Sequence, residues 1–205
     1  MNETFKTPFS RTYWRLSFAE LKSVKTLVLA ALFIALRIAL KLFKIPIAAN
    51  MNVFFTFTVN ALGSFIYGPV VAFLSGTVCD TLSFIIKPSG PYNPAFMLVE
   101  ALGSFIYALY VYRARVSVVR LFLSKLTVNV FCNIFLTSLF LWPMYGKGKT
   151  MFLYMIGRAP KNLTMLPAET VMLAVTFAVM LPILKRTKVL PWLKQQVLAI
   201  GVLGH

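Results

Sequence analysis

Long apolar runs follow one another along most of the chain, separated by short polar or proline-containing connections. The runs hold about 17 to 27 residues each, the length that a helix needs to cross roughly 30 Å of hydrocarbon. The pattern predicts an all-α integral membrane protein, a bundle of six transmembrane helices at 25–185, between a basic segment at 1–24 and a tail at 186–205. The predicted spans are 25–44, 51–67, 69–87, 94–112, 118–143 and 166–185.

Composition and charge agree with this class. Hydrophobic residues make up 59% of the chain, charged residues 13%, and the mean hydropathy is +0.80, which excludes an ordinary soluble domain. The net charge of +16 comes mostly from basic residues that lie between spans or near their ends, so it favours anionic headgroups, membrane topology and an anionic ligand over nucleic acid. We expect a multi-pass protein of the cell membrane.

The basic residues also predict the topology. An even number of spans places both termini on the same side of the membrane. If that side is the cytoplasm, twelve basic residues lie on the cytoplasmic side and seven on the outer side, as the excess of basic residues in cytoplasmic loops requires. We therefore predict that both termini are cytoplasmic. The twelve are Lys6, Arg11, Arg15, Lys22, Lys25, Arg113, Arg115, Arg120, Lys185, Arg186, Lys188 and Lys194.

A repeated heptapeptide and two unusual connections stand out. "ALGSFIY" occurs at 61–67 and again at 101–107, and its small residues would let helices approach closely, whether it reflects a duplication or shared packing. The connections 87–96 and 143–169 are rich in proline, glycine and large apolar residues. Irregular backbone at a membrane face is tolerated where it lines a cavity, so we expect these connections to form a lid over a planar ligand.

Ionisable residues recur at one depth of the predicted bundle. Counted from the span ends, Arg37, Asp80 and Glu100 lie in one layer and Glu169 lies just above it, so all four can converge on one cavity. Asn129 and Asn133 are four residues apart and add neutral hydrogen-bonding groups on one helical face. The alternative for Arg37 is a structural ion pair with Asp80 or Glu100.

The first span has two different faces. At about 100° per residue, Ala31, Ala35 and Ala39 fall on one side, opposite Arg37 and Lys41. The alanine face suits close packing on another helix, and the basic face would point toward the bundle.

No motif for catalysis or cofactor binding is present. The chain lacks a Walker phosphate loop, HExxH and GxSxG with a partner histidine, and its one histidine is His205. We therefore expect no enzymatic activity, no cofactor and no metal, and Cys79 and Cys132 are interpreted as small buried residues.

Four stretches of the sequence carry a family resemblance: "LVLAALFIALRIAL", "ALGSFIYGPVVAFLSGTVCDTLSFIIKPSGPYNPAF", "SKLTVNVFCNIFLTSLFLWPMYGK" and "GRAPKNLTMLPAETVML". Over about residues 25–185 the chain resembles the folate-family substrate-binding S components of the energy-coupling factor (ECF) vitamin transporters. This resemblance implies a subunit that captures folate at the outer face and delivers it inward, with Ala31, Ala35 and Ala39 contacting a transmembrane scaffold subunit that is coupled to two ATPases.

The chemistry of folate suits the polar residues of the chain. A carboxylate can accept two N–H groups from the pterin edge, and the two carboxylates of the glutamate tail require arginine or lysine. We expect Asp80 or Glu169 to bind the pterin edge. Candidate neighbours are Asn129, Asn133 and Asn162 for the pterin, Arg37, Arg158 and Lys161 for the tail or the lid, and Tyr92, Phe96 and Tyr154 for the flat rings.

Two alternatives stay open. The cargo could be another flat, anionic vitamin or heterocycle, because a polar pocket selects charge and shape more than identity. The second alternative is a membrane-embedded enzyme or small channel that uses Asp80, Glu100 and Glu169. The aromatic and proline-rich outer loops favour closure over a ligand rather than an open pore.

Overall fold

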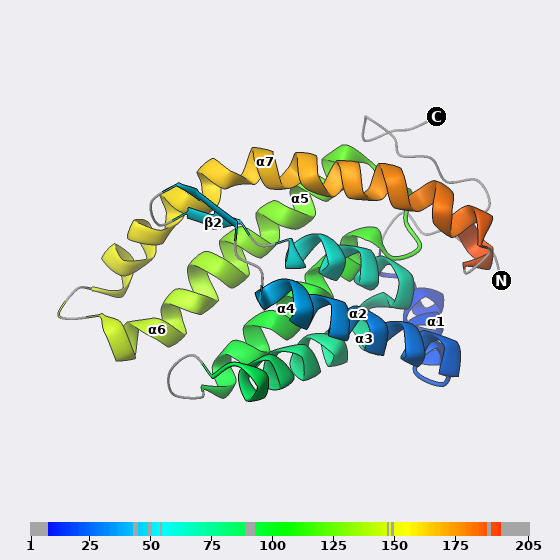
Figure 1. Cartoon of the computed structure of the whole chain (residues 1–205), viewed down its shortest axis with the longest axis horizontal. Helices are drawn as coiled ribbons and strands as arrows, with labels where there is room; N and C mark the ends of the chain where they lie inside the picture. Colours follow the sequence, from blue (N-terminus) through cyan, green and yellow to red (C-terminus); the bar gives the residue numbers. More distant parts are fainter. Residues whose placement is uncertain are drawn as a thin grey trace.

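A computed structural model of the chain describes residues 8–42, 45–48, 51–53, 55–88, 93–146, 148, 150–187 and 190–193. Within these ranges the protein is a bundle of helices with one small β-hairpin (Figure 1). The helices are α1 (Arg11–Glu20), α2 (Val24–Leu42), α3 (Thr56–Ile86), α4 (Pro94–Val111), α5 (Val118–Thr127), the π-helix η1 (Val128–Leu136), α6 (Thr137–Tyr145), α7 (Met151–Arg186) and the 3₁₀ turn η2 (Pro191–Leu193).

Helix α3 consists of two arms. Gly68 has φ +78°, outside the helical region, and Pro69 begins the second arm, so the helix breaks there. Asn60 and Ser83 line the same cavity, although a straight helix would separate them by roughly 35 Å. The arms therefore run in opposite directions, as Figure 1 shows. With α2, α4, the continuous α5–η1–α6 helix and α7, they make the six predicted helices within the described ranges.

Several predicted boundaries were wrong. The second span begins at Thr56, because residues 51–53 form strand β2 (Met51–Val53), which pairs antiparallel with β1 (Ile45–Ala48). The predicted connection at 143–169 is mostly helix, since α6 continues to Tyr145 and α7 begins at Met151. Pro160 and Pro167 lie within α7 on its exposed side, and neighbouring groups compensate such prolines in membrane helices.

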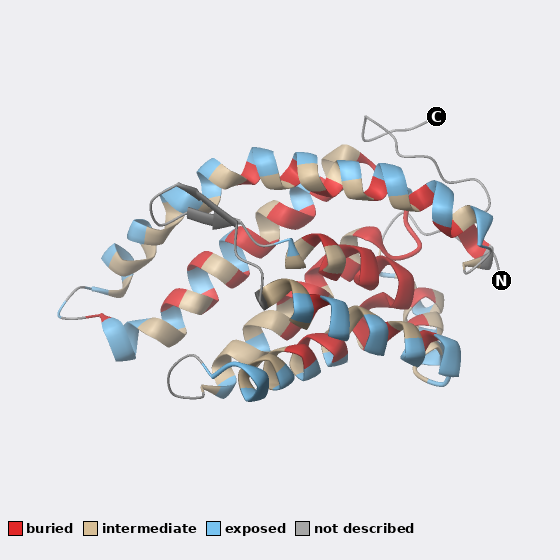
Figure 2. Cartoon of the chain, viewed as in Figure 1, coloured by how far each residue is buried: buried red, intermediate tan, exposed pale blue. Residues whose placement is uncertain are grey.

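Four described helices are long and apolar enough to cross a membrane, and a fifth candidate combines α1 with α2 across a 76° bend. The four are Thr56–Ile86, Pro94–Val111, Val118–Tyr145 and Met151–Arg186. Figure 2 shows that buried residues gather where α3, α4 and α5 meet, whereas the outward faces of α2 and α7 are exposed. Apolar residues on such outward faces are expected where the solvent is lipid.

The N-terminal segment and the residues after α7 pack at one end of the bundle. Tyr112, just after α4, accepts a hydrogen bond from Arg113 and donates one to Glu20 of α1. Its ring also contacts Trp192 of η2 edge-on. Burial raises the pKa of Tyr112 to about 12, so its hydroxyl remains protonated and can bridge both partners. Both ends of the described chain thus meet at Tyr112; the side of the membrane on which they lie stays a prediction.

The two copies of "ALGSFIY" pack against each other. The Ser64 hydroxyl of α3 donates a hydrogen bond of 3.0 Å to the Ser104 carbonyl of α4, and both serines are fully buried. The small residues of the repeat therefore bring the first arm of α3 close to α4. The residue before each copy, Asn60 in α3 and Glu100 in α4, reaches the cavity described below.

Candidate functional site

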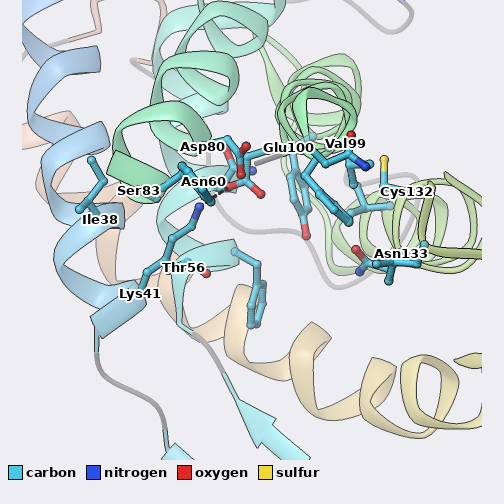
Figure 3. A pocket seen from close by; sticks show the side chains of 18 of the residues that line it. Ile38, Lys41, Thr56, Asn60, Asp80, Ser83, Val99, Glu100, Cys132 and Asn133 are labelled. Atoms are coloured by element: carbon cyan, nitrogen blue, oxygen red, sulfur yellow. Dashed lines mark ion pairs between the residues drawn. The ribbon is translucent and has the colours of Figure 1, made fainter. Parts of the chain in front are cut away.

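A cavity of about 730 Å³ lies between the helices at the end of the bundle opposite Tyr112. Residues from α2, both arms of α3, α4, the α5–η1–α6 helix and α7 line it, and Figure 3 shows their side chains converging. A cavity of this size fits a vitamin-sized ligand. The three acidic residues of the wall are Asp80, Glu100 and Glu169, which confirms that these predicted carboxylates converge.

Glu100 forms the centre of the first charged group. The Arg37 guanidinium of α2 forms a hydrogen-bonded ion pair with Glu100. The Lys41 ammonium lies 3.5 Å from the same Glu100 oxygen, and Figure 3 labels both Lys41 and Glu100 at the cavity. Arg37 is 0% exposed and does not line the cavity, whereas Lys41 does. The structure therefore contains the ion pair that the sequence left open as the alternative for Arg37.

Glu169 of α7 forms the centre of the second group. The Lys125 ammonium of α5 lies 3.0 Å from one Glu169 oxygen, and the Asn129 amide donates to the other at 3.1 Å. Lys125 is only 3% exposed, and its ammonium also lies 4.1 Å from the centre of the Phe57 ring. This buried cation is satisfied by a carboxylate and a π-face.

The π-helix η1 holds the polar groups next to Glu169. The Asn133 side-chain amide donates to the side-chain oxygen of Asn129 at 2.9 Å, and the Asn129 side-chain amide donates to the Asn162 backbone carbonyl of α7 at 3.0 Å. Side chains four apart still meet along this segment, and π-helical turns are frequent at functional sites. Asn129 thus ties the wall of the cavity to α7, while Asn133 faces the cavity itself.

Asp80 differs from the other two carboxylates. Within the described ranges no basic nitrogen lies within ion-pair distance of it, and Figure 3 shows it beside Asn60 and Glu100 at the cavity wall. Lys87 follows α3 at the exposed end of the cavity and has no ion pair in the described part of the chain either. Among the described residues, the cavity therefore offers one carboxylate, Asp80, and one cation, Lys87, that are available to a ligand.

The predicted site residues within the described ranges fall into three groups. Asp80, Phe96, Asn133 and Glu169 line the cavity. Arg37 and Asn129 do not line it but hold lining residues, and Asn162 accepts a hydrogen bond from Asn129 through its backbone carbonyl. Tyr154, Arg158 and Lys161 belong to the first turns of α7 and do not line it, and Tyr92 lies outside the described residues. Contact of each of these residues with a ligand stays a prediction.

Several polar lining residues were missed from the sequence, among them Asn60, Lys87, Tyr107 and Lys125. Lys125 could have been found, because it lies four residues before Asn129 in the same apolar run. Asn60 could have been found as well, because it precedes the first copy of the repeat, as Glu100 precedes the second. Tyr107 ends the second copy and carried no separate signal. Within the described ranges, no cluster of three histidine, cysteine or acidic residues could hold a metal ion.

The alanine face of α2 lies away from the cavity. Ala31, Ala35 and Ala39 are exposed, while Arg37 on the opposite face is fully buried. This confirms the predicted separation of the two faces. Exposed Leu32 and Leu36 flank the alanines, so this face of α2 is apolar and its alanine side chains are small.

Comparisons with known proteins agree with this architecture. Residues 25–188 match the family described as "ECF transporter, substrate-specific component". The folate transporter FolT of Clostridium novyi (strain NT) is 28% identical over 154 residues, which cover 75% of this chain and 88% of that protein. A crystal structure of FolT bound with folic acid, also 28% identical, has a TM-score of 0.63 and covers 72% of this chain and 88% of that one. The chain therefore belongs to the substrate-specific components of ECF transporters, multi-pass proteins of the cell membrane.

Proposed function

We propose that this protein binds folate in the cavity and, together with a transmembrane scaffold subunit and two ATP-binding subunits, delivers it into the cell. The observation that carries the proposal is a vitamin-sized cavity with a carboxylate at its wall and a cation at its exposed end, Asp80 and Lys87. The likeness to FolT bound with folic acid supports the same ligand. The chain itself carries out no chemical reaction.

Asp80 is the carboxylate that we assign to the pterin edge. The 2-amino group and the ring N–H of a pterin form a pair of donors that one carboxylate accepts bidentately. Glu169 is already held by Lys125 and Asn129, and Glu100 by Arg37 and Lys41, so only Asp80 has its oxygens free for this contact among the described residues. Phe96 lines the same cavity and is placed to contact the flat rings.

The glutamate tail then extends toward the exposed end of the cavity. Lys87 lies there, at the C-terminal end of α3, and Lys41 lies deeper along the wall. A lysine ammonium attracts a carboxylate without demanding one fixed geometry, which suits a flexible tail. Arg158 and Lys161 of α7 remain candidates for contacts made when the cavity closes.

Binding of folate by the purified protein tests the proposal. We expect a dissociation constant below about 1 μM, and mass spectrometry of freshly purified protein should identify retained folate. Other flat, anionic vitamins should compete only at much higher concentration. Failure to bind folate, under conditions in which a FolT protein binds it, would contradict the assignment, and retention of a different heterocycle would identify the alternative cargo.

Asp80→Asn tests the assigned carboxylate. Loss of a charge-assisted bidentate contact should weaken folate binding about 10- to 100-fold. Lys87→Met should weaken binding of folic acid but not of pteroic acid, which lacks the glutamate tail. If Asp80→Asn binds folate as tightly as the unmodified protein, Asp80 does not contact the pterin.

A further inference from the structure

Two neutral polar groups in the cavity wall have no hydrogen-bond partner in the described part of the chain: the Asn60 side-chain oxygen and the Tyr107 hydroxyl. Asn60 is 7% exposed and Tyr107 is 1% exposed, so little water reaches them. Buried polar atoms are nearly always hydrogen-bonded, and an unpaired one destabilises the fold. Both residues line the cavity, which is where a missing partner would be supplied.

Each of the two unpartnered groups has a counterpart in the other copy of the repeated heptapeptide, and that counterpart has a partner. Tyr67 ends the first copy, and its hydroxyl accepts a hydrogen bond from Ser75 at 3.3 Å. Tyr107 occupies the same place in the second copy but has no such partner. Conversely, Glu100 precedes the second copy and is ion-paired, whereas its counterpart Asn60 is not hydrogen-bonded through its oxygen. Of the residue before each copy and the tyrosine that ends it, one is therefore satisfied and one is not.

We propose that Asn60 and Tyr107 together hydrogen-bond the flat heterocyclic ring of the ligand and select it by its N–H donors. This inference rests on the proposed function and names two residues of the site that determine specificity. The Asn60 oxygen can only accept, so its partner must carry an N–H or O–H group; a carboxylate tail offers none at neutral pH. The ring of a pterin carries several such donors, beside the edge assigned to Asp80.

The position of these residues agrees with a ring rather than a tail. Figure 3 shows Asn60 beside Asp80 and Lys41 on the wall of the cavity. Tyr107 lies on α4, whose Glu100 is already paired, and faces the same space. A tyrosine hydroxyl can accept a hydrogen bond from a ring N–H, and it can also donate one to a ring nitrogen or ring carbonyl. Neutral groups of this kind reject ligands that lack the matching atom, because they would then remain buried and unpaired.

Tyr107→Phe is the first test, with Tyr110→Phe as its matched control. Tyr110 lies one turn further along α4, outside the cavity lining, and its hydroxyl is hydrogen-bonded to Thr127 at 3.0 Å. We expect Tyr107→Phe to weaken folic acid binding about 10- to 100-fold, and Tyr110→Phe to change it less than about threefold. Isothermal titration calorimetry in detergent measures both.

Thermal stability without ligand separates a binding role from a structural one. Tyr107→Phe removes an unpaired buried hydroxyl and should leave the melting temperature unchanged or raise it by about 2–4 °C. Tyr110→Phe loses a hydrogen bond and should lower it. A lower melting temperature for Tyr107→Phe together with unchanged folate affinity would overturn the inference.

Asn60→Leu and a truncated ligand complete the test. Asn60→Leu should weaken folic acid and pteroic acid by the same factor, again about 10- to 100-fold, because both ligands contain the ring. A loss confined to folic acid would place Asn60 at the tail and overturn the inference while leaving the proposed function intact. Absence of folate binding by the unmodified protein would instead overturn the proposed function, on which the inference rests.

Discussion

At the scale of single residues, the ion pair between buried Arg37 and Glu100 determines how removal of a carboxylate charge changes the stability of the protein. Arg37 is fully buried and its carboxylate partner is Glu100, so Glu100→Gln should leave an uncompensated buried cation and destabilise the protein by about 3–5 kcal/mol. Asp80→Asn should change stability by less than about 0.5 kcal/mol, because Asp80 has no ion pair among the described residues. Thermal or denaturant unfolding in detergent measures both variants.

The double variant Arg37→Met/Glu100→Gln is the control for this prediction. It removes both charges, so it should recover most of the stability that Glu100→Gln loses. Equal unfolding of Glu100→Gln and Asp80→Asn would contradict a structural role for the pair. Reduced folate affinity in the stable double variant would instead show that Arg37 contributes to ligand binding.

At the scale of elements, Asn129 connects the π-helix to α7. Its side chain hydrogen-bonds the Asn162 carbonyl, the Glu169 carboxylate and the Asn133 amide. Asn129→Ala should therefore destabilise the protein by about 2–4 kcal/mol, since three half-buried groups lose a partner at once. Asn133→Ala loses one of these bonds and should cost about 1 kcal/mol. Hydrogen exchange of α7 is the direct measurement, and equal exchange in both variants would contradict the bridging role.

Close packing of α3 on α4 leads to a second prediction at this scale. A Cβ atom on Gly76 would lie 2.6 Å from the Ala101 Cα and 2.8 Å from the Glu100 carbonyl oxygen, so Gly76→Ala must push the helices apart. We expect a loss of about 1–3 kcal/mol in unfolding free energy and weaker folate binding, because Glu100 would move. Gly157→Ala on α7 meets nothing within 4 Å and should stabilise the protein by up to about 1 kcal/mol. Equal free energies of unfolding for Gly76→Ala and Gly157→Ala would contradict the close approach of α3 to α4.

The same elements show what could be predicted from the sequence. Apolar run lengths predict the helices, and helical periodicity predicts the opposite faces of α2, because both depend on local geometry alone. The start of α7 was missed, since Gly157 and Pro160 resemble loop residues in isolation. The pairing of Lys125 with Glu169 was missed too, because it depends on how α5 and α7 are rotated against each other, which tertiary packing decides.

At the scale of the whole molecule, the exposed alanine face of α2 predicts where the proposed scaffold subunit contacts this chain. Ala31, Ala35 and Ala39 are exposed on the side opposite Arg37, and small residues let a partner helix approach closely. Ala35→Leu should therefore leave folate binding and stability of the isolated protein unchanged. It should reduce co-purification with the scaffold and ATP-binding subunits about tenfold, which corresponds to about 1.4 kcal/mol of lost packing.

Ala178→Leu on α7 is the matched control, because Ala178 is exposed on a different helix and the same added bulk should only meet lipid. Folate uptake by cells that express all subunits should fall for Ala35→Leu and remain normal for Ala178→Leu. Because the cavity and the alanine face lie on opposite sides of α2, ligand capture and complex assembly can be lost independently. An Ala35→Leu variant that assembles and transports normally would show that the scaffold contacts another face of the bundle.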